Sequence, residues 1–183
     1  SKPSKNSSSQ IVEYPVEIQG ETIKEQPTRV LSMSPSLTEM IYDLGYDSLL
    51  VGVSDYTAYP DSAKSKLACG TVQLPKLDEI KKVNPQLILA SSNFAESDLI
   101  KLQQMNANVI IIPKAKSIEQ LKANYINLSK ALGGKTTGGK NGEDVYFNIS
   151  KKLTEAERMI KSYISQNDKA AQSAIILKRL DYN

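Results

Sequence analysis

The sequence predicts an α/β fold in which helices cover a mainly parallel sheet and a long helix follows that sheet. Short apolar runs alternate with helix-like segments between residues 30 and 132. Each run is apolar at consecutive positions, as a strand buried on both faces of a parallel sheet requires. Beyond residue 142, apolar residues recur every three or four positions, which indicates one long helix. The order strand, helix, strand favours right-handed crossovers and a helix-covered sheet.

The composition limits the classes of function. The 183 residues, 40% of them apolar, suffice for the core of one domain with an appendage, and no run reaches the ~18 apolar residues of a membrane span. The 23 basic and 20 acidic side chains form no basic block inside the expected domain, so we expect no nucleic-acid partner. One cysteine and no histidine argue against an internal disulfide, a zinc site and Ser/His/Asp catalysis. We therefore expect no catalytic residue, no metal ligand and no cofactor.

The chain begins with a polar segment and a short hairpin. Residues 1–10 are polar and of low complexity, and are interpreted as a flexible tether. Such a tail commonly follows the lipidated cysteine of a bacterial surface lipoprotein, and a disordered end without a function is equally consistent with the composition. The segment 11–18, the turn at Gln19 and Gly20, and the return to Ile23 predict an edge hairpin, because Pro15 would not be tolerated in a central strand.

The segment from Arg29 to Gly45 predicts a strand, a polar turn and a helix. The apolar run from Val30 to Met33 ends before Pro35, which forces its predecessor into an extended conformation. A capping box, an apolar helical face and a terminal glycine then define the helix: Ser36 with Glu39; Leu37, Met40, Ile41 and Leu44; and Gly45. Free N–H groups at the helix start face the strand end, where ligands usually bind in open α/β sheets. An ordinary βα turn with a good cap is the alternative interpretation.

Further strands and helices follow in alternation. Strands are predicted at 49–53, 86–90 and 108–112, and helices at 77–83, 95–105 and 117–132. The third of these helices opens with a second capping box, formed by Ser117 and Gln120. Its predicted buried stripe consists of Ile118, Leu121, Tyr125, Leu128 and Leu132.

The sequence changes character after Gly134. Residues 135–142 are rich in glycine and lysine and predict a loop, and a helix of roughly 35 Å follows from about residue 143 to residue 166. The apolar run 174–177 predicts a strand that opens a further, absent domain. The expected organisation is therefore a tether, an α/β lobe, a loop with a long helix, and the first strand of a missing lobe: 1–10, 11–134, 135–168 and 169–183.

Five segments in order resemble the cobalamin and ferric-siderophore periplasmic binding proteins, and look most like the vitamin B12 binders. They are Arg29–Glu39, Val51–Pro60, Leu77–Ile80, Asn84–Ala90 and Ser117–Leu121. The resemblance implies a receptor of an ABC importer that holds its ligand between two α/β lobes joined by a rigid helix. This chain would then supply the N-terminal lobe, the connector helix and the first strand of the other lobe.

The resemblance also implies ligand-binding residues. Tyr56 occupies the position where the B12 binders offer an aromatic ring to the corrin face, although a half-buried loop tyrosine is the plain alternative. Ser34, Pro35 and Ser36 line the same mouth. Tyr59 either shapes the pocket or packs on the proline that follows it. Val72 stands where the B12 binders place a second aromatic residue, and the absence of tryptophan weakens the B12 assignment.

The resemblance places a permease-docking carboxylate on the 77–83 helix. Asp78 aligns with the glutamate that contacts arginines of the membrane permease in the family, and Glu79 is adjacent. A carboxylate in the first turn of a helix is also favoured by the helix dipole alone. Cys69 is interpreted as a small buried apolar residue, with a reactive thiol as the minor alternative.

Three functions are weighed. The first is the substrate-binding component of an ABC importer, extracytoplasmic, lipid-anchored and monomeric, which captures a corrinoid or an iron chelate and delivers it to a permease. The second is a one-lobed interaction module without ligand affinity. The third is a small α/β enzyme, which lacks histidine, a phosphate loop and a nucleophile elbow. We expect weak or absent ligand binding by this chain alone. Residues 170–183 are expected to be disordered, to pack non-natively or to pair with another copy in a non-physiological dimer.

Overall fold

The computed structural model describes residues 11–180, so the predicted tether at 1–10 lies outside the described residues. The chain divides into two compact units, Ser1–Val145 and Tyr146–Asn183. The first unit holds both sheets, and the second consists of the later part of one long helix.

The main sheet confirms the predicted parallel arrangement. Its five strands are β3 (Val30–Ser32), β4 (Leu50–Val53), β5 (Leu67–Ala68), β6 (Leu87–Ala90) and β7 (Asn108–Ile111), and every neighbouring pair is parallel. Four of these strands were predicted. β5 was not predicted, because its two residues are too few to form a recognisable apolar run.

The order of the strands creates a reversal point in the middle of the sheet. The order is β5-β4-β3-β6-β7, so the chain runs from β3 out to β5 and then returns to the other side of β3. Ser32 of β3 lies opposite Leu89 of β6, and the Met33 N–H donates to the Leu89 carbonyl at 2.7 Å. In open α/β sheets, ligands bind outside the carboxyl ends of the strands at such a point.

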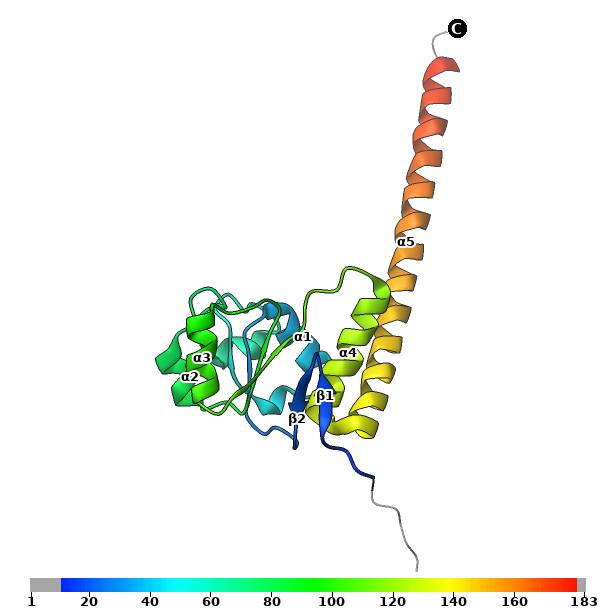
Figure 1. Ribbon diagram of the computed structural model, residues 1–183. Helices are drawn as coiled ribbons and strands as arrows, with labels where there is room; N and C mark the ends of the chain where they lie inside the picture. The colour runs from blue at the N-terminus through cyan, green and yellow to red at the C-terminus, as the bar shows by residue number, and fades with distance from the viewer. Residues whose placement is uncertain (1–10, 181–183) are drawn as a thin grey trace, which may run out of the picture. The chain divides into compact units, whose positions relative to one another are not determined.

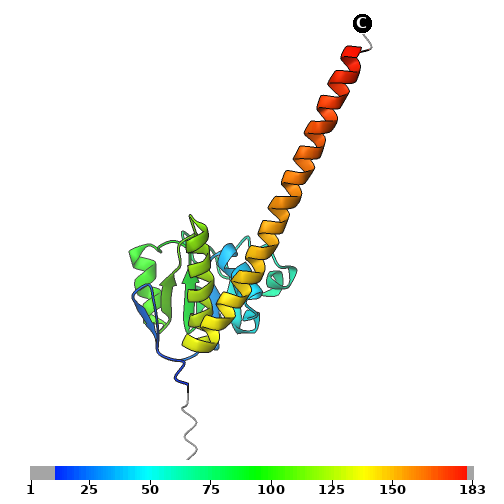
Figure 2. The ribbon, with the colours of Figure 1, turned by 90° about the vertical axis from the view of Figure 1, so that its right-hand side faces the viewer.

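Helices cover both faces of this sheet (Figure 1). On one face, α2 (Leu77–Val83) and α3 (Glu96–Gln104) bury Ile80 and Leu102 against alternate strand residues, among them Leu31 and Ile88. On the other face lie α1 (Pro35–Asp43) and α4 (Ile118–Gly133), which contact each other. The Tyr125 hydroxyl of α4 donates to Asp43 of α1 at 2.7 Å. Figure 2 looks onto α4, with the strands behind it.

The capping box predicted at Ser36 and Glu39 is wrong. The N-cap residue of α1 is Ser34, whose backbone is extended, and Pro35 already occupies the first turn. The fixed φ of proline and its missing N–H suit the first helical position, so the N-cap lies two residues before the predicted one. The predicted end is confirmed, because Gly45 follows the C-cap residue Leu44 with a φ of 78°.

The second predicted capping box and the buried stripe of α4 are each partly confirmed. The Ser117 hydroxyl accepts the Gln120 N–H at 3.1 Å. The Gln120 side chain accepts the Lys116 N–H at 2.7 Å, and not the N–H of Ser117 as a capping box requires. Tyr125, Leu128 and Leu132 are buried, whereas Ile118 is 71% exposed. Periodicity identifies the apolar face of a helix but not how much of its length covers the sheet, and burial begins here only beyond the first turn.

Removing this cap gives a simple test of the helix start. We expect Ser117→Ala to lower the free energy of unfolding by about 1 kcal/mol, because the Gln120 N–H loses its acceptor. Urea denaturation followed by circular dichroism measures the change. Ser97→Ala, at an exposed serine inside α3, is the matched control and should change the free energy of unfolding by less than about 0.5 kcal/mol. Equal effects of the two changes would contradict the capping role.

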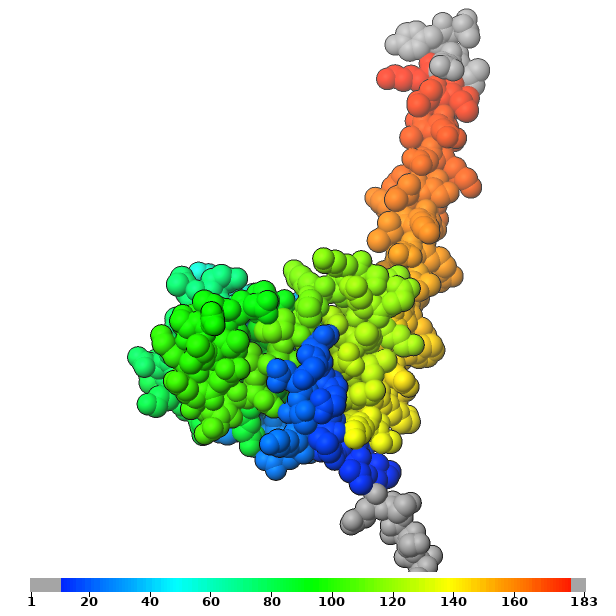
Figure 3. Space-filling model, in the orientation of Figure 1, coloured from blue at the N-terminus to red at the C-terminus, as the bar shows by residue number. Residues whose placement is uncertain are grey.

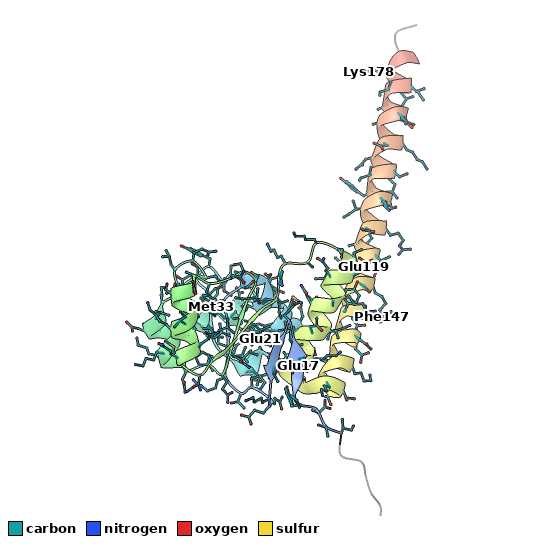
Figure 4. The ribbon with its side chains drawn as sticks, in the orientation of Figure 1. Glu17, Glu21, Met33, Glu119, Phe147 and Lys178 are labelled. Carbon is teal, nitrogen blue, oxygen red and sulfur yellow. The ribbon has the colours of Figure 1, made fainter. Side chains whose placement is uncertain are left out.

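The predicted edge hairpin is confirmed. β1 (Val16–Ile18) and β2 (Glu21–Ile23) form a separate antiparallel pair. Their apolar side chains are buried while Glu17 and Glu21 point outward (Figure 4). The hairpin lies beside α4 (Figure 1), and the Asn108 side-chain amide fastens it to β7 by donating to the Thr22 carbonyl at 2.9 Å.

The loop predicted at 135–142 is wrong. A π-helical turn, η3 (Gly134–Gly138), is followed at once by α5 (Gly139–Leu180). The Glu13 carboxylate accepts the Thr137 hydroxyl at 2.5 Å and the N–H groups of Thr136 at 2.8 Å and of Thr137 at 3.1 Å. The bond from the Thr137 hydroxyl is the largest cause that lowers the pKa of Glu13, and the two N–H groups lower it further. Glu13, near the start of the described chain, thus provides acceptors for backbone N–H groups of the 134–138 turn. Sequence spacing could not reveal a contact between residues so far apart.

The long helix is confirmed and is longer than predicted. α5 includes residues 169–180, so the strand predicted within 169–183 is wrong over that range, and residues 181–183 lie outside the described part. A helix satisfies its backbone groups internally, whereas a lone strand needs a neighbour. In the second unit, apolar side chains such as Leu153, Ile160 and Ile164 are exposed. Within residues 11–180, no helix is long and apolar enough to cross a membrane.

Candidate functional site

Four loops gather at the carboxyl edge of the main sheet. They follow β3, β4, β5 and β6, and because all these strands are parallel their carboxyl ends share one edge. With Pro35 and Ser36, the first two residues of α1, counted with the loop after β3, these segments comprise residues 33–36, 54–60, 69–76 and 91–94. Part of the surface of the 54–76 region is visible as the cyan-to-teal atoms at the upper left of Figure 3. These four segments contain every candidate ligand-binding residue that the sequence suggested.

The loop after β3 is held by buried hydroxyl groups. The Ser34 carbonyl accepts the Thr38 N–H at 3.0 Å, and the Thr38 hydroxyl donates to the Ser32 hydroxyl at 2.9 Å. Ser34 is itself buried, with its Oγ 3.0 Å from the Ser36 Oγ. Pro35 is exposed and Ser36 half-buried. Of the three predicted residues, Pro35 and Ser36 are therefore in contact with solvent, and Ser34 lies beneath the surface.

The loop after β4 presents two tyrosines to solvent. Tyr56 is 89% exposed and Tyr59 is 64% exposed. Tyr56 has a φ of 65°, a left-handed conformation that costs a side-chain-bearing residue roughly 1 kcal/mol. The Thr57 hydroxyl stabilises the bend by donating to the Ser54 carbonyl at 2.9 Å. The loop thus holds an aromatic ring in solvent at a conformational cost.

The loop after β5 places its two apolar side chains differently from the expectation. Val72 is only 5% exposed and belongs to the core cluster below the sheet edge. Leu74 is 79% exposed. Leu74 was not predicted to be a site residue, because an apolar residue inside a loop belongs to no periodic pattern. The structure thus offers Leu74, and not Val72, to the surface at this edge.

The loop after β6 contributes polar residues that the sequence analysis missed. Ser92 and Asn93 are exposed, and the loop is anchored by the buried ring of Phe94. β6 is the neighbour of β3 at the reversal point, so this loop adjoins Pro35 and Ser36 in the sheet order. The available signal was a polar run directly after a fully apolar strand.

The two predicted docking carboxylates lie in the first turn of α2 and differ in solvent exposure and in ion pairing. Asp78 is exposed. The Glu79 carboxylate is 2.7 Å from the ammonium group of Lys82 and is partly buried. Asp78 is therefore the better placed of the two for an outside partner.

The side chains exposed at this edge can make apolar contacts and hydrogen bonds. Tyr56, Tyr59 and Leu74 offer apolar surface, and Ser36 and Ser92 offer hydroxyl groups. Within residues 11–180, no group of three or more histidine, cysteine or acidic side chains is arranged to hold a metal ion.

Cys69 is a buried structural residue beneath the site. Its side chain is fully buried, and burial raises the pKa of the thiol from 9.0 to about 11. This rise lowers the thiolate population at pH 8 by roughly 100-fold. We therefore expect iodoacetamide to label Cys69 at least about 100-fold more slowly in the folded protein than in urea, as measured by mass spectrometry. Equal labelling rates in the two states would show that the thiol is exposed.

Comparisons with known proteins agree with this geometry. The family model for periplasmic binding proteins matches residues 30–172. A vitamin B12-binding protein of Vibrio vulnificus is 30% identical over 142 residues, which are 76% of this chain and 50% of that protein. YvrC of Bacillus subtilis, an ABC transporter substrate-binding lipoprotein, is 26% identical over 152 residues, or 81% of this chain and 47% of YvrC.

A solved structure supports the same fold. The crystal structure of a periplasmic heme-binding protein from Pseudomonas aeruginosa has a TM-score of 0.66 at 21% identity, covering 74% of this chain and 48% of that one. The chain thus spans about half the length of the relatives that it matches. With a family model that covers most of its residues and a fold shared with a solved member, this chain belongs to the periplasmic binding protein family.

Proposed function

We propose that this chain supplies one lobe of the substrate-binding component of an ABC importer, and that the carboxyl edge of its main sheet binds a corrinoid. The observation that carries the proposal is the exposed Tyr56, which is held at the edge where α/β sheets bind ligands. The ring offers a flat apolar face, as a macrocycle requires, and a hydroxyl group that reaches amide side chains. The identity of 30% with a vitamin B12-binding protein supports this class of ligand.

The charges at the edge favour a corrinoid over an anionic iron chelate. In the four loops the one cationic side chain is Lys76, whose ammonium group is 2.9 Å from the Asp55 carboxylate. An anionic chelate calls for unpaired cationic groups, whereas the amide groups around a corrin need hydrogen-bonding partners. Ser36 and Ser92 supply such partners. Iron chelates remain the second class of ligand to be tested.

The proposed receptor would lie outside the cytoplasm and dock onto a membrane permease. By analogy with the B. subtilis lipoprotein, we place the protein outside the cytoplasm on a lipid anchor. Asp78, exposed in the first turn of α2, would contact arginines of the permease. Ligand capture and delivery involve no bond making, so the proposed protein is not an enzyme.

Calorimetry with cyanocobalamin and a panel of ferric siderophores tests the proposal on the 183-residue chain and on the full-length gene product. We expect a Kd of about 1 mM or weaker for the chain alone, since one lobe covers one face of a ligand that pockets bury to about 70–90%. A two-lobed form should bind at least about 100-fold more tightly.

Each outcome has a distinct meaning. If no ligand of the panel binds to a two-lobed form, the proposed ligand classes are wrong and the interaction module is favoured. A Kd below about 10 μM for the 183-residue chain would contradict the account based on one lobe.

A further inference from the structure

We infer that Asp55 is a positioning residue that joins the loops after β4 and β5, and that the joined loops present Tyr56 and Leu74 as ligand-contacting residues. The inference rests on the proposed function and deepens it. It assigns to Leu74 the contact that the sequence suggested for Val72, and it gives the paired Lys76 a structural role.

Asp55 makes contacts from both its backbone and its side chain to the loop after β5. Its N–H donates to the Gly70 carbonyl at 2.7 Å, and its Oδ1 accepts the Gly70 N–H at 3.0 Å. Its Oδ2 lies 2.9 Å from the Nζ of Lys76. One aspartate thus binds the start and the end of the segment that carries Leu74.

The segment between these two attachments is a tight turn. Gly70 forms an isolated antiparallel bridge with Pro75, and the Lys76 N–H donates to the Cys69 carbonyl at 2.9 Å. The Leu74 N–H donates to the Thr71 hydroxyl at 3.1 Å. These bonds fix the backbone on both sides of Leu74 while its side chain stays exposed. A leucine held in this way contacts a ligand without the loss of loop entropy that a free loop would suffer.

The pKa shifts of Asp55 and Lys76 agree with an ion pair between the two loops. The hydrogen bond from Lys76 is the largest cause that lowers the pKa of Asp55, and the same bond raises the pKa of Lys76. Tyr56 is the next residue in the chain after Asp55. The bonds of Asp55 to the Leu74 segment therefore also fix the backbone just before Tyr56. Without the Asp55 carboxylate, the backbone bond from residue 55 to the Gly70 carbonyl would remain, and the side-chain bonds to the Gly70 N–H and to Lys76 would be lost.

Amide exchange tests the attachment without any ligand. In the 183-residue chain we expect Asp55→Ala to speed exchange of the Gly70 N–H at least tenfold, because that N–H loses its acceptor. Asp55→Asn keeps an oxygen acceptor and loses the ion pair, so it should give a smaller increase. Asp61→Asn, which breaks the exposed Asp61–Lys64 pair of 2.8 Å, is the matched control and should leave exchange unchanged. Unchanged Gly70 exchange in Asp55→Ala would overturn the attachment.

Affinity for cyanocobalamin, measured in the full-length gene product, tests the role of the attached residues. We expect Asp55→Ala and Leu74→Ser each to weaken binding about tenfold, Asp55→Asn to retain part of the affinity, and Asp61→Asn to retain all of it. Val72→Ala should lower the melting temperature without weakening binding by the folded protein.

The outcomes separate this inference from the proposed function. If the parent protein does not bind cyanocobalamin, the proposed corrinoid function fails, and the exchange experiment still decides the attachment. If the parent protein binds and both Asp55→Ala and Leu74→Ser bind equally well, the inference is wrong while the proposed function stands. Stronger loss in Val72→Ala than in Leu74→Ser would also overturn the assignment of Leu74.

Discussion

Gly70→Ala is expected to lower the free energy of unfolding by about 2–5 kcal/mol. Gly70 has a φ of 91°, and a Cβ placed on it would lie 2.4 Å from the Leu74 carbonyl oxygen and 2.7 Å from the Lys76 nitrogen. Both atoms belong to backbone that Asp55 and its partners hold in place, so the loop has no flexible side chain to move aside. Urea denaturation followed by circular dichroism measures the loss.

Gly20→Ala separates the cost of the left-handed backbone conformation from the cost of the steric clash at residue 70. Gly20 has a similar φ of 81°, but nothing lies within 4 Å of a Cβ built there. Its replacement should therefore cost only the strain of the left-handed conformation, about 1 kcal/mol. If the two alanine variants lose equal stability, the close approach at Gly70 plays no part.

Tyr56→Gly is expected to weaken cyanocobalamin binding by the full-length gene product about 30-fold without lowering the free energy of unfolding. The ring is 89% exposed, so its removal loses little packing in the free protein. Glycine adopts the φ of 65° without strain, which offsets its greater freedom in the unfolded chain. Calorimetry and urea denaturation give the two quantities.

A second tyrosine supplies the control for this prediction. Tyr163 is 68% exposed on α5, in the other compact unit, and Tyr163→Ala should leave the affinity unchanged. If Tyr56→Gly binds as tightly as the parent protein, the proposed aromatic contact is wrong. If Tyr56→Gly is much less stable than the parent protein, the ring has a packing role that its exposure does not reveal.

Apolar runs and caps were enough to predict most of the first unit. The runs at Val30, Leu50, Leu87 and Asn108 became parallel strands, and Ser117 became a helix cap. These signals are local, because a strand buried on both faces must be apolar at consecutive positions and a cap acts on N–H groups three residues away. The errors at Ser36 and Ile118 are also local, since a pattern identifies a helix better than its first turn.

Contacts between distant residues could not be predicted. The Glu13 carboxylate turned the expected 135–142 loop into a helical junction from 124 residues away. Residues 174–177 lie in α5, although four consecutive apolar residues are equally typical of a strand. In the first case the backbone N–H groups are satisfied by a distant carboxylate, and in the second by hydrogen bonds within the helix. Composition specifies neither kind of partner.

By itself, the sequence determined the α/β class, the parallel strands and the resemblance that identified Tyr56 as a residue of interest. Only the tertiary structure decided which side chains share the edge of the sheet. Strand order set the reversal point between β3 and β6, and packing in the core cluster with Ile80 and Leu102 buried Val72, whereas Leu74 stayed exposed. Local patterns reflect the faces of single elements, whereas exposure at a shared edge depends on how several elements pack together.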